Sequence, residues 1–264
     1  MQLAAGSGYT QRMRQGALAV GPRVRVAETY EALSQAAARI ICDEVKEHPD
    51  LLLCASAGGT PTRAYQLIAA RACRQPRLFA RLRVIQIDEW GGLVPGDPAT
   101  CEADLRSKLM GPLGITGDRF IELRTNADEP AAECSRVARW LAANGPIGIC
   151  ILGLGINGHV AMNEPGAALT PHAHVARLAS SSRRHAMLKS LAQKPRYGLT
   201  LGMGDILRSR RILLLVNGPR KRAALRRLMR PAVSTHFPAS LLWLHPETTV
   251  LCDREAAEDI SNRL

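Results

Sequence analysis

The chain of 264 residues is poor in aromatic side chains, which make up only 4% of it. Proteins that bind single-stranded nucleic acid stack bases on aromatic platforms, and this composition offers few. Lys and Arg exceed Asp and Glu enough to give a formal charge of +12, but apart from one cluster between Arg220 and Arg230 they are scattered singly. We therefore do not expect nucleic acid as a partner, and the positive charge favours anionic metabolites instead.

Paired cysteines and long apolar runs are also missing. The seven cysteines form no C-x-x-C pair, which argues against a disulfide framework or a zinc ribbon. Cys42, Cys54, Cys150 and Cys252 fall in apolar runs and are expected to be free core residues of a cytoplasmic protein. No apolar run approaches the roughly 20 residues that span a bilayer, so no membrane partner is expected.

No metal site is expected from the histidines that follow Glu164. His172 and His174 alternate in a stretch without regular patterning, and no cluster of further ligands accompanies them. The loss of patterning between Glu164 and His185, with the run Ser180-Ser181-Ser182, predicts a covering loop.

Short apolar runs alternate with helical periodicity along the chain. Strands are predicted at 24–27, 51–55, 84–87, 120–123, 147–152, 197–201, 212–216, 238–244 and 249–252, and helices at 31–47, 101–110, 130–143, 185–193 and from 255 onward. This order predicts an α/β protein, with one mostly parallel, Rossmann-like sheet and helices on both of its faces. We expect a single domain over residues 23–264, preceded by a loose arm at 1–22.

The most informative stretch follows the apolar run at 147–152. Three glycines come within six residues there, in G-L-G-I-N-G, and His159 and Glu164 follow them. Ligands of open α/β sheets sit beyond the carboxyl ends of the strands, where an imidazole and a carboxylate favour acid–base chemistry. Two alternatives remain: a glycine-rich turn with an unrelated histidine, and a dinucleotide site, which would need an acidic residue about 20 positions on.

Two further loops have the character of anion sites. The strand at 51–55 runs into Ser56–Pro61, where Thr60 suits a helix N-cap and Pro61 a first helical turn. Such a glycine loop before a helix N-terminus binds anions, although a plain tight turn has the same pattern. Lys221 follows the strand at 212–216 in the first turn of another predicted helix, where a cation is unfavourable unless an anion is present.

Asp88 and Glu89 stand at the carboxyl end of the strand at 84–87. Two adjacent acidic residues are not expected in a core, because charges are rarely buried unpaired. One of them can also be explained as a helix cap or a salt-bridge partner, and both interpretations stay open at this point.

Four segments together resemble the superfamily of glucosamine-6-phosphate deaminases and 6-phosphogluconolactonases. They are A-S-A-G-G-T-P, I-Q-I-D-E-W-G-G-L, L-G-L-G-I-N-G-H-V-A-M-N-E-P-G and P-A-S-L-L-W-L-H, and the similarity runs from about residue 24 to 253. The lactonases are similar in the G-H turn but lack the N-E-P continuation, which favours the deaminases. The fragments D-P-A-T-C-E, R-H-A-M-L-K and V-S-T-H-F-P-A-S resemble the galactosamine-6-phosphate branch more closely.

The resemblance implies a role for each matching residue. Asp88 corresponds to the base that moves a proton between C1 and C2, His159 to the ring-opening acid and base, and Glu164 to the carboxylate that orients His159. The phosphate cradle corresponds to Gly58, Gly59, Thr60 and Lys221, with Lys189 as the cation nearest to a further arginine of the family.

Asn157 departs from the glucosamine deaminases, which carry an aspartate at this position. With asparagine there, Glu164 is the carboxylate expected to hold His159. The alternative is that Asn157 only closes the glycine-rich turn, since asparagine tolerates left-handed backbone angles.

The activity implied is conversion of galactosamine 6-phosphate to tagatose 6-phosphate and ammonia. The alternatives are glucosamine-6-phosphate deamination, which yields fructose 6-phosphate, and a sugar-phosphate-binding regulator without catalysis. Ring opening, proton transfer and imine hydrolysis need no redox cofactor or metal, so none is expected. The expected partners are a small-molecule sugar phosphate and, as one option, further copies of the chain.

Overall fold

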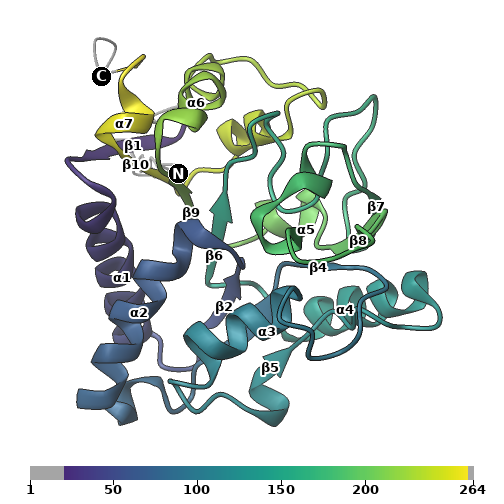
Figure 1. Cartoon of the computed structure of the whole chain (residues 1–264). Coiled ribbons are helices and arrows are strands. Elements are labelled where there is room, and N and C mark those ends of the chain that lie inside the picture. The colour runs from purple at the N-terminus through teal and green to yellow at the C-terminus, as the bar shows by residue number, and fades with distance from the viewer. Residues whose placement is uncertain (1–20, 261–264) are drawn as a thin grey trace, which may run out of the picture.

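Seven parallel strands form the central sheet of the computed structural model, which describes residues 21–260 (Figure 1). Across the sheet they lie in the order β1 (Arg23–Ala27), β10 (Thr248–Asp253), β9 (Arg211–Val216), β6 (Ile149–Gly153), β2 (Leu52–Ala55), β3 (Arg83–Gln86) and β5 (Phe120–Ile121). From β2 the chain proceeds outward to β3 and β5, whereas from β6 it proceeds the other way to β9 and β10. The order therefore reverses between β2 and β6, and such a switch point is where open α/β sheets bind ligands.

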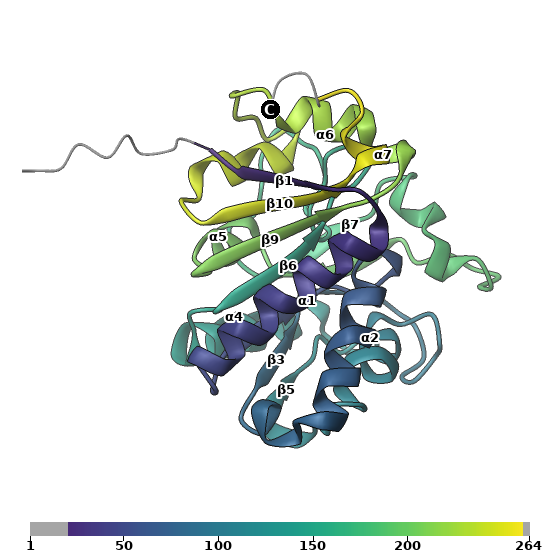
Figure 2. The ribbon, with the colours of Figure 1, turned by 90° about the vertical axis from the view of Figure 1, so that its left-hand side faces the viewer.

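Helices cover both faces of this sheet, as the continuous apolar strands predict. The helices α1 (Tyr30–Glu47) and α2 (Gly59–Arg74) lie on one face, which Figure 2 shows toward the viewer. The opposite face carries α4 (Pro130–Asn144), α5 (Met203–Leu207), α6 (Arg222–Leu228) and α7 (Arg254–Ala257).

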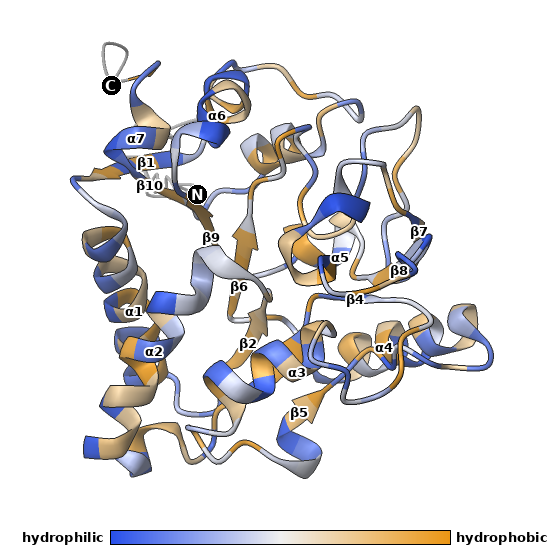
Figure 3. Cartoon of the chain, viewed as in Figure 1, coloured by the Kyte–Doolittle hydropathy of each residue, from blue (hydrophilic) through white to orange (hydrophobic). Residues whose placement is uncertain are grey.

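Alternate side chains of each strand enter the two cores. Leu53 and Ile151 pack under α1 and α2, while their neighbours Leu52 and Cys150 pack against the helices of the other face. The central strands are accordingly the most apolar part of the chain (Figure 3). The predicted fold class and the four predicted core cysteines are thus confirmed, and all seven cysteines are free.

A second sheet, antiparallel and three-stranded, was not expected from the sequence. It consists of β4 (Asp88–Trp90), β8 (Tyr197–Thr200) and β7 (His174–Arg177). The predicted strand at 197–201 is therefore real but belongs to this sheet. The chain leaves β3 after Gln86 and enters β4 at Asp88, so Asp88 lies where the two sheets meet.

The strand predicted at 238–244 is wrong, because Pro238–Leu244 forms a 3-10 helix. Both edges of β10 are already occupied, by β1 and by β9, so no position in the sheet is left beside it. The Ser240 hydroxyl contacts the Phe237 carbonyl at 2.7 Å, and the Ala239 amide donates to the Gly158 carbonyl at 2.9 Å. These bonds hold the segment as a turn against the loop that follows β6.

The helix predicted at 185–193 is also wrong. Two short 3-10 turns, Ser182–Arg184 and Ala186–Leu188, stand there, separated by His185 in an extended conformation. The Lys194 ammonium donates to the carbonyls of Leu188 and Leu191, and the Leu191 amide donates to the Leu188 carbonyl at 3.2 Å, which is a turn and not a continuing helix. The predicted helix at 101–110 consists of α3 (Cys101–Leu105) and a π-helical turn, Arg106–Met110.

The arm predicted at 1–22 lies outside the described residues, except for its last two positions. Within the described part of the chain, no helix is long and apolar enough to cross a membrane. The same part holds no group of three His, Cys, Asp or Glu side chains suited to a metal ion.

Gly158 fixes the turn that follows β6. Its φ of +90° lies in the region that favours glycine. A Cβ atom at this position would approach the Phe237 ring to 2.0 Å, and the Arg227 guanidinium covers the ring at 4.4 Å. Gly218 has a similar φ of +81°, but a Cβ atom there would meet nothing within 4 Å.

Gly158→Ala is expected to destabilise the protein more than Gly218→Ala. An alanine held at a positive φ costs both variants about 1–3 kcal/mol. Only Gly158→Ala must also displace Phe237, which adds about 1–3 kcal/mol, the usual cost of overpacking. Denaturant unfolding of the two variants and the wild type measures the difference. Equal losses would show that Phe237 does not fix the turn.

Candidate active site

The loops that follow β2, β6 and β9 meet at the switch point of the central sheet. The Thr60 hydroxyl, after β2, donates to the Asn217 side chain, after β9, at 2.7 Å. The Lys221 ammonium reaches across to the Leu154 carbonyl, after β6, at 2.5 Å. The structure thus brings the predicted anion loops together over the carboxyl end of β6.

The loop after β2 offers two free backbone donors. The amides of Gly59 and Thr60 donate to no acceptor within residues 21–260, as is usual for a helix N-terminus. The Gly58 amide is different, because it donates to the Asp104 carboxylate at 2.9 Å. Gly58 therefore provides the bend of the loop, with φ +103°, and not a donor.

The start of α2 differs from the prediction. The N-cap is Gly58 and α2 begins at Gly59, so Thr60 lies inside the first turn. Its hydroxyl binds Asn217 and is not available to cap the helix. The hydroxyl of Tyr30, the first residue of α1, contacts the carbonyls of Gly59 and Thr60 at 2.9 and 3.0 Å. These contacts fix the start of α2 against α1.

Lys221 lies slightly earlier than predicted. It ends the 3-10 turn Pro219–Lys221, and α6 begins at Arg222. Burial, together with the charge of Arg220, lowers the pKa of the Lys221 ammonium. A half-buried ammonium without an acidic partner in the described chain is a site that an anion would stabilise.

His159, Glu164 and Asn157 form a compact relay in the turn after β6. The His159 Nδ1 lies 3.3 Å from Glu164 Oε2, and the Asn157 Nδ2 donates to the same oxygen at 2.9 Å. The Asn157 side-chain oxygen, Oδ1, also accepts a hydrogen bond from the His159 backbone amide at 3.2 Å. Asn157 therefore does more than close the turn, because it binds both other members. Gly155 leaves room for the imidazole, since a Cβ atom there would lie 2.6 Å from its ring.

Glu164 also binds a segment that the sequence did not connect with it. The Ser182 hydroxyl donates to Glu164 Oε1, and the Ala179 amide donates to the same oxygen at 3.3 Å. Burial tends to raise the pKa of Glu164, but the bonds from His159, Ser182 and Asn157 outweigh it and bring the pKa to about 2. Glu164 is thus held as a carboxylate.

The environment of Asp88 shifts its pKa in the opposite direction from that of Glu164. Burial first, and then the charge of the adjacent Glu89, raises the pKa of Asp88 to about 7, although a bond with the Cys101 side chain opposes the rise. The adjacent Glu89 instead binds the backbone at the start of α3. It is fully buried and accepts the backbone amides of Cys101 and Glu102, both at 2.8 Å, at the start of α3.

His185 lies beside the glycine loop after β2, a position that the sequence analysis did not predict. Its ring edge lies 3.6 Å from where a Cβ atom on Gly58 would stand, and its ring centroid is 5.7 Å from that of Trp90. Lys189 is exposed, and its ammonium forms no hydrogen bond or ion pair within residues 21–260. The signal that could have found His185 was its place in R-H-A-M-L-K, four residues before Lys189.

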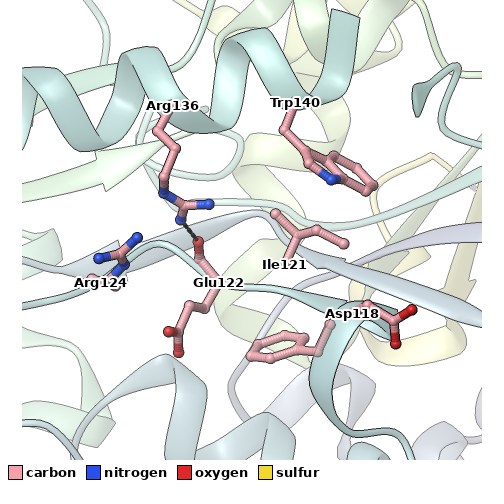
Figure 4. A pocket seen from close by; sticks show the side chains of 7 residues that line it. Asp118, Ile121, Glu122, Arg124, Arg136 and Trp140 are labelled. Atoms are coloured by element: carbon pink, nitrogen blue, oxygen red, sulfur yellow. Dashed lines mark hydrogen bonds between the residues drawn. The ribbon is translucent and has the colours of Figure 1, made fainter. Parts of the chain in front are cut away.

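A separate groove lies beside β5 and α4 (Figure 4) and contains none of the predicted site residues. It is lined by Asp118, Phe120, Ile121, Glu122, Arg124, Arg136 and Trp140. The Arg136 guanidinium is already bound to the Glu133 carboxylate and to the Glu122 carbonyl, so it does not offer a free cation. The titratable residues predicted for the site thus lie beyond the carboxyl ends of β3 and β6 and not in this groove.

Comparisons with known proteins show the family to which the chain is similar. Residues 25–251 match the family of glucosamine-6-phosphate isomerases and 6-phosphogluconolactonase. The Bacillus subtilis glucosamine-6-phosphate deaminase 1 is 37% identical over 237 residues, which are 89% of this chain and 98% of that protein. The Escherichia coli protein AgaI, which is provisionally assigned as a deaminase, is 37% identical over 218 residues. These residues are 83% of this chain and 86% of AgaI.

Solved structures show the same similarity. A monomeric glucosamine-6-phosphate deaminase superposes with a TM-score of 0.86 at 36% identity, covering 90% of this chain and 99% of that one. The 6-phosphogluconolactonase of Trypanosoma brucei has a TM-score of 0.73 at 21% identity, covering 91% and 99%, and shares the fold.

Asp88→Asn is expected to stabilise the protein at pH 8 and much less at pH 5. A carboxyl group with a raised pKa contributes stability below its unfolded pKa, and this contribution is lost as the pH rises through about 7. The amide does not titrate, so the variant avoids that loss. After allowance for the partial exposure of Asp88, the gain is about 1–2 kcal/mol.

Denaturant unfolding at both pH values measures this gain. Asp128→Asn, which changes an exposed carboxylate, is the control and should show no such difference. An Asp88→Asn gain that is the same at both pH values would contradict the raised pKa.

Proposed function

Because the chain belongs to the family of glucosamine-6-phosphate isomerases and 6-phosphogluconolactonases, we propose that this enzyme deaminates a hexosamine 6-phosphate. Its preferred substrate is galactosamine 6-phosphate, which yields tagatose 6-phosphate and ammonia. The main support is the contrast between two carboxyl groups at one sheet edge, Asp88 with a pKa of about 7 and Glu164 with a pKa of about 2. Groups whose environments separate their pKa values in this way mark acid–base assignments.

Asp88 is the base of the isomerisation. Near neutral pH it exists in both protonation states, so it can take the C2 proton of the open-chain sugar and return it to C1. The ketose imine that forms is hydrolysed by water to the ketose and ammonia. Glu164 stays ionised and does not compete for this proton.

His159 opens the sugar ring. Ring opening requires a group that moves the proton of the ring oxygen, and histidine is suited to this near neutral pH. Glu164 and Asn157 orient its imidazole, one through Nδ1 and the other through the backbone amide.

The substrate phosphate binds where the loops after β2 and β9 meet. The free amides of Gly59 and Thr60 and the Lys221 ammonium are the donors of this site. Binding the phosphate away from the reacting carbons supplies energy that positions C2 over Asp88.

The preference for the galactosamine epimer rests on the sequence. By the resemblance, Asn157 stands where glucosamine deaminases have aspartate, and the fragments D-P-A-T-C-E and R-H-A-M-L-K are similar to the galactosamine branch. A cytoplasmic location is part of the proposal, supported by seven free cysteines of which six are buried.

Ammonia release from galactosamine 6-phosphate and glucosamine 6-phosphate, measured side by side, tests the proposal. We expect release from both, with the higher kcat/KM for galactosamine 6-phosphate, and none from unphosphorylated galactosamine. A higher kcat/KM for glucosamine 6-phosphate would refute the epimer preference only. Binding of both sugar phosphates without ammonia release would identify a regulator.

Lys221→Met is expected to raise KM by about 10- to 150-fold. This is the effect of losing one charge-assisted contact of about 1.5–3 kcal/mol. The matched control is Lys189→Met, because the Lys189 side chain is exposed and its ammonium has no polar partner in the described chain. Steady-state kinetics of both variants show which of the two lysines binds the phosphate. A larger KM effect for Lys189→Met would place the phosphate beside Lys189.

A further inference from the structure

We propose that Ser182 is a positioning residue of the reaction, whose hydroxyl holds Glu164 so that His159 presents its Nε2 atom to the substrate. This inference rests on the proposed function for its kinetic consequences, but its structural part can be tested without activity. Ser182 itself does not touch the reacting atoms in this scheme.

Ser182 is the buried member of the run Ser180-Ser181-Ser182. It is 7% exposed, and its hydroxyl donates to Glu164 Oε1. Ser180 is exposed and Ser181 half-buried, and neither side chain forms a hydrogen bond within residues 21–260. Only one serine of the run therefore contacts the relay.

The two oxygens of Glu164 are held by different parts of the chain. Oε2 contacts Asn157 and His159, which belong to the same turn as Glu164. Oε1 contacts Ser182 and the Ala179 amide, which belong to the covering segment 179–185. Without the Ser182 hydroxyl, Oε1 keeps only the bond of 3.3 Å from Ala179, so the carboxylate is held less firmly in the orientation that faces His159.

These contacts also select the tautomer of His159. Ser182 has a single hydroxyl proton, and Glu164 Oε1 receives it, so the Ser182 oxygen faces His159 Nδ1 as an acceptor at 3.5 Å. Glu164 Oε2 faces the same nitrogen at 3.3 Å and is also an acceptor. Two acceptors at Nδ1 place the proton on that nitrogen, which leaves Nε2 as the acceptor for the ring-opening proton.

Kinetics of Ser182→Ala, with Ser181→Ala as the matched control, are the first test. We expect Ser182→Ala to lower kcat by about 10- to 100-fold, the usual effect of losing a hydrogen bond to a charged group. KM should change by less than about threefold, because the phosphate site at Gly59, Thr60 and Lys221 is intact. Ser182→Thr keeps the hydroxyl and should restore most of kcat.

The second test observes His159 directly by 15N NMR of labelled histidines at alkaline pH, with His159→Gln used for assignment. In the wild type and Ser181→Ala we expect the Nδ1–H tautomer. In Ser182→Ala we expect a mixture of both tautomers. Ser182→Cys, which keeps the volume but is a weaker donor, should lie between them and replaces Ser182→Ala if that variant is unstable.

The outcomes separate the two proposals. An unchanged tautomer in Ser182→Ala, or a kcat within twofold of that of Ser181→Ala, would overturn the role of Ser182 while leaving the deaminase function in place. A kcat loss that Ser182→Thr does not restore would also overturn it, because the loss would then come from packing. A wild type that releases no ammonia but shows the fixed tautomer would refute the function and not the contact.

Discussion

The parallel pairing of β6 with β2 on one side and β9 on the other is the constraint on which the site depends. Parallel strands end at the same edge, so the loops after these three strands must lie together. The strand order reverses between β2 and β6, and such a switch point is where open α/β sheets bind ligands. The Thr60–Asn217 and Lys221–Leu154 bonds then join the three loops across it.

Near this switch point the fold holds two carboxyl groups in opposite environments. Asp88 stands where the chain passes from the parallel to the antiparallel sheet, so it is largely enclosed and lies beside the fully buried Glu89. Glu164 is also largely enclosed, but donors from two segments of the chain surround it. The same cost of burial therefore leaves one group able to exchange protons near neutral pH and the other permanently ionised.

The sequence allows prediction of those parts of the fold and site that depend on local spacing. The apolar runs predict the parallel strands, and Asn157, His159 and Glu164 lie within eight positions of one turn, so their meeting follows from local geometry. Ser182 reaches Glu164 from 18 positions away, and His185 meets Gly58 across the molecule. Such contacts depend on how the antiparallel sheet folds back, which periodicity does not encode. Residues 238–244 have an apolar pattern typical of a strand, but no edge of β10 is free.

The Asn157 side chain fits the arrangement of its two neighbours, Glu164 and His159. Its amide nitrogen donates to Glu164 while its carbonyl oxygen accepts the His159 backbone amide, so both ends of the side chain are used. An aspartate in this place would direct an oxygen instead of a donor at Glu164 Oε2, and the repulsion would raise the pKa of one of the two carboxyl groups. Asparagine leaves Glu164 as the single anion of the relay. The orientation of His159 then depends on one carboxylate, and on the covering segment that holds its other oxygen.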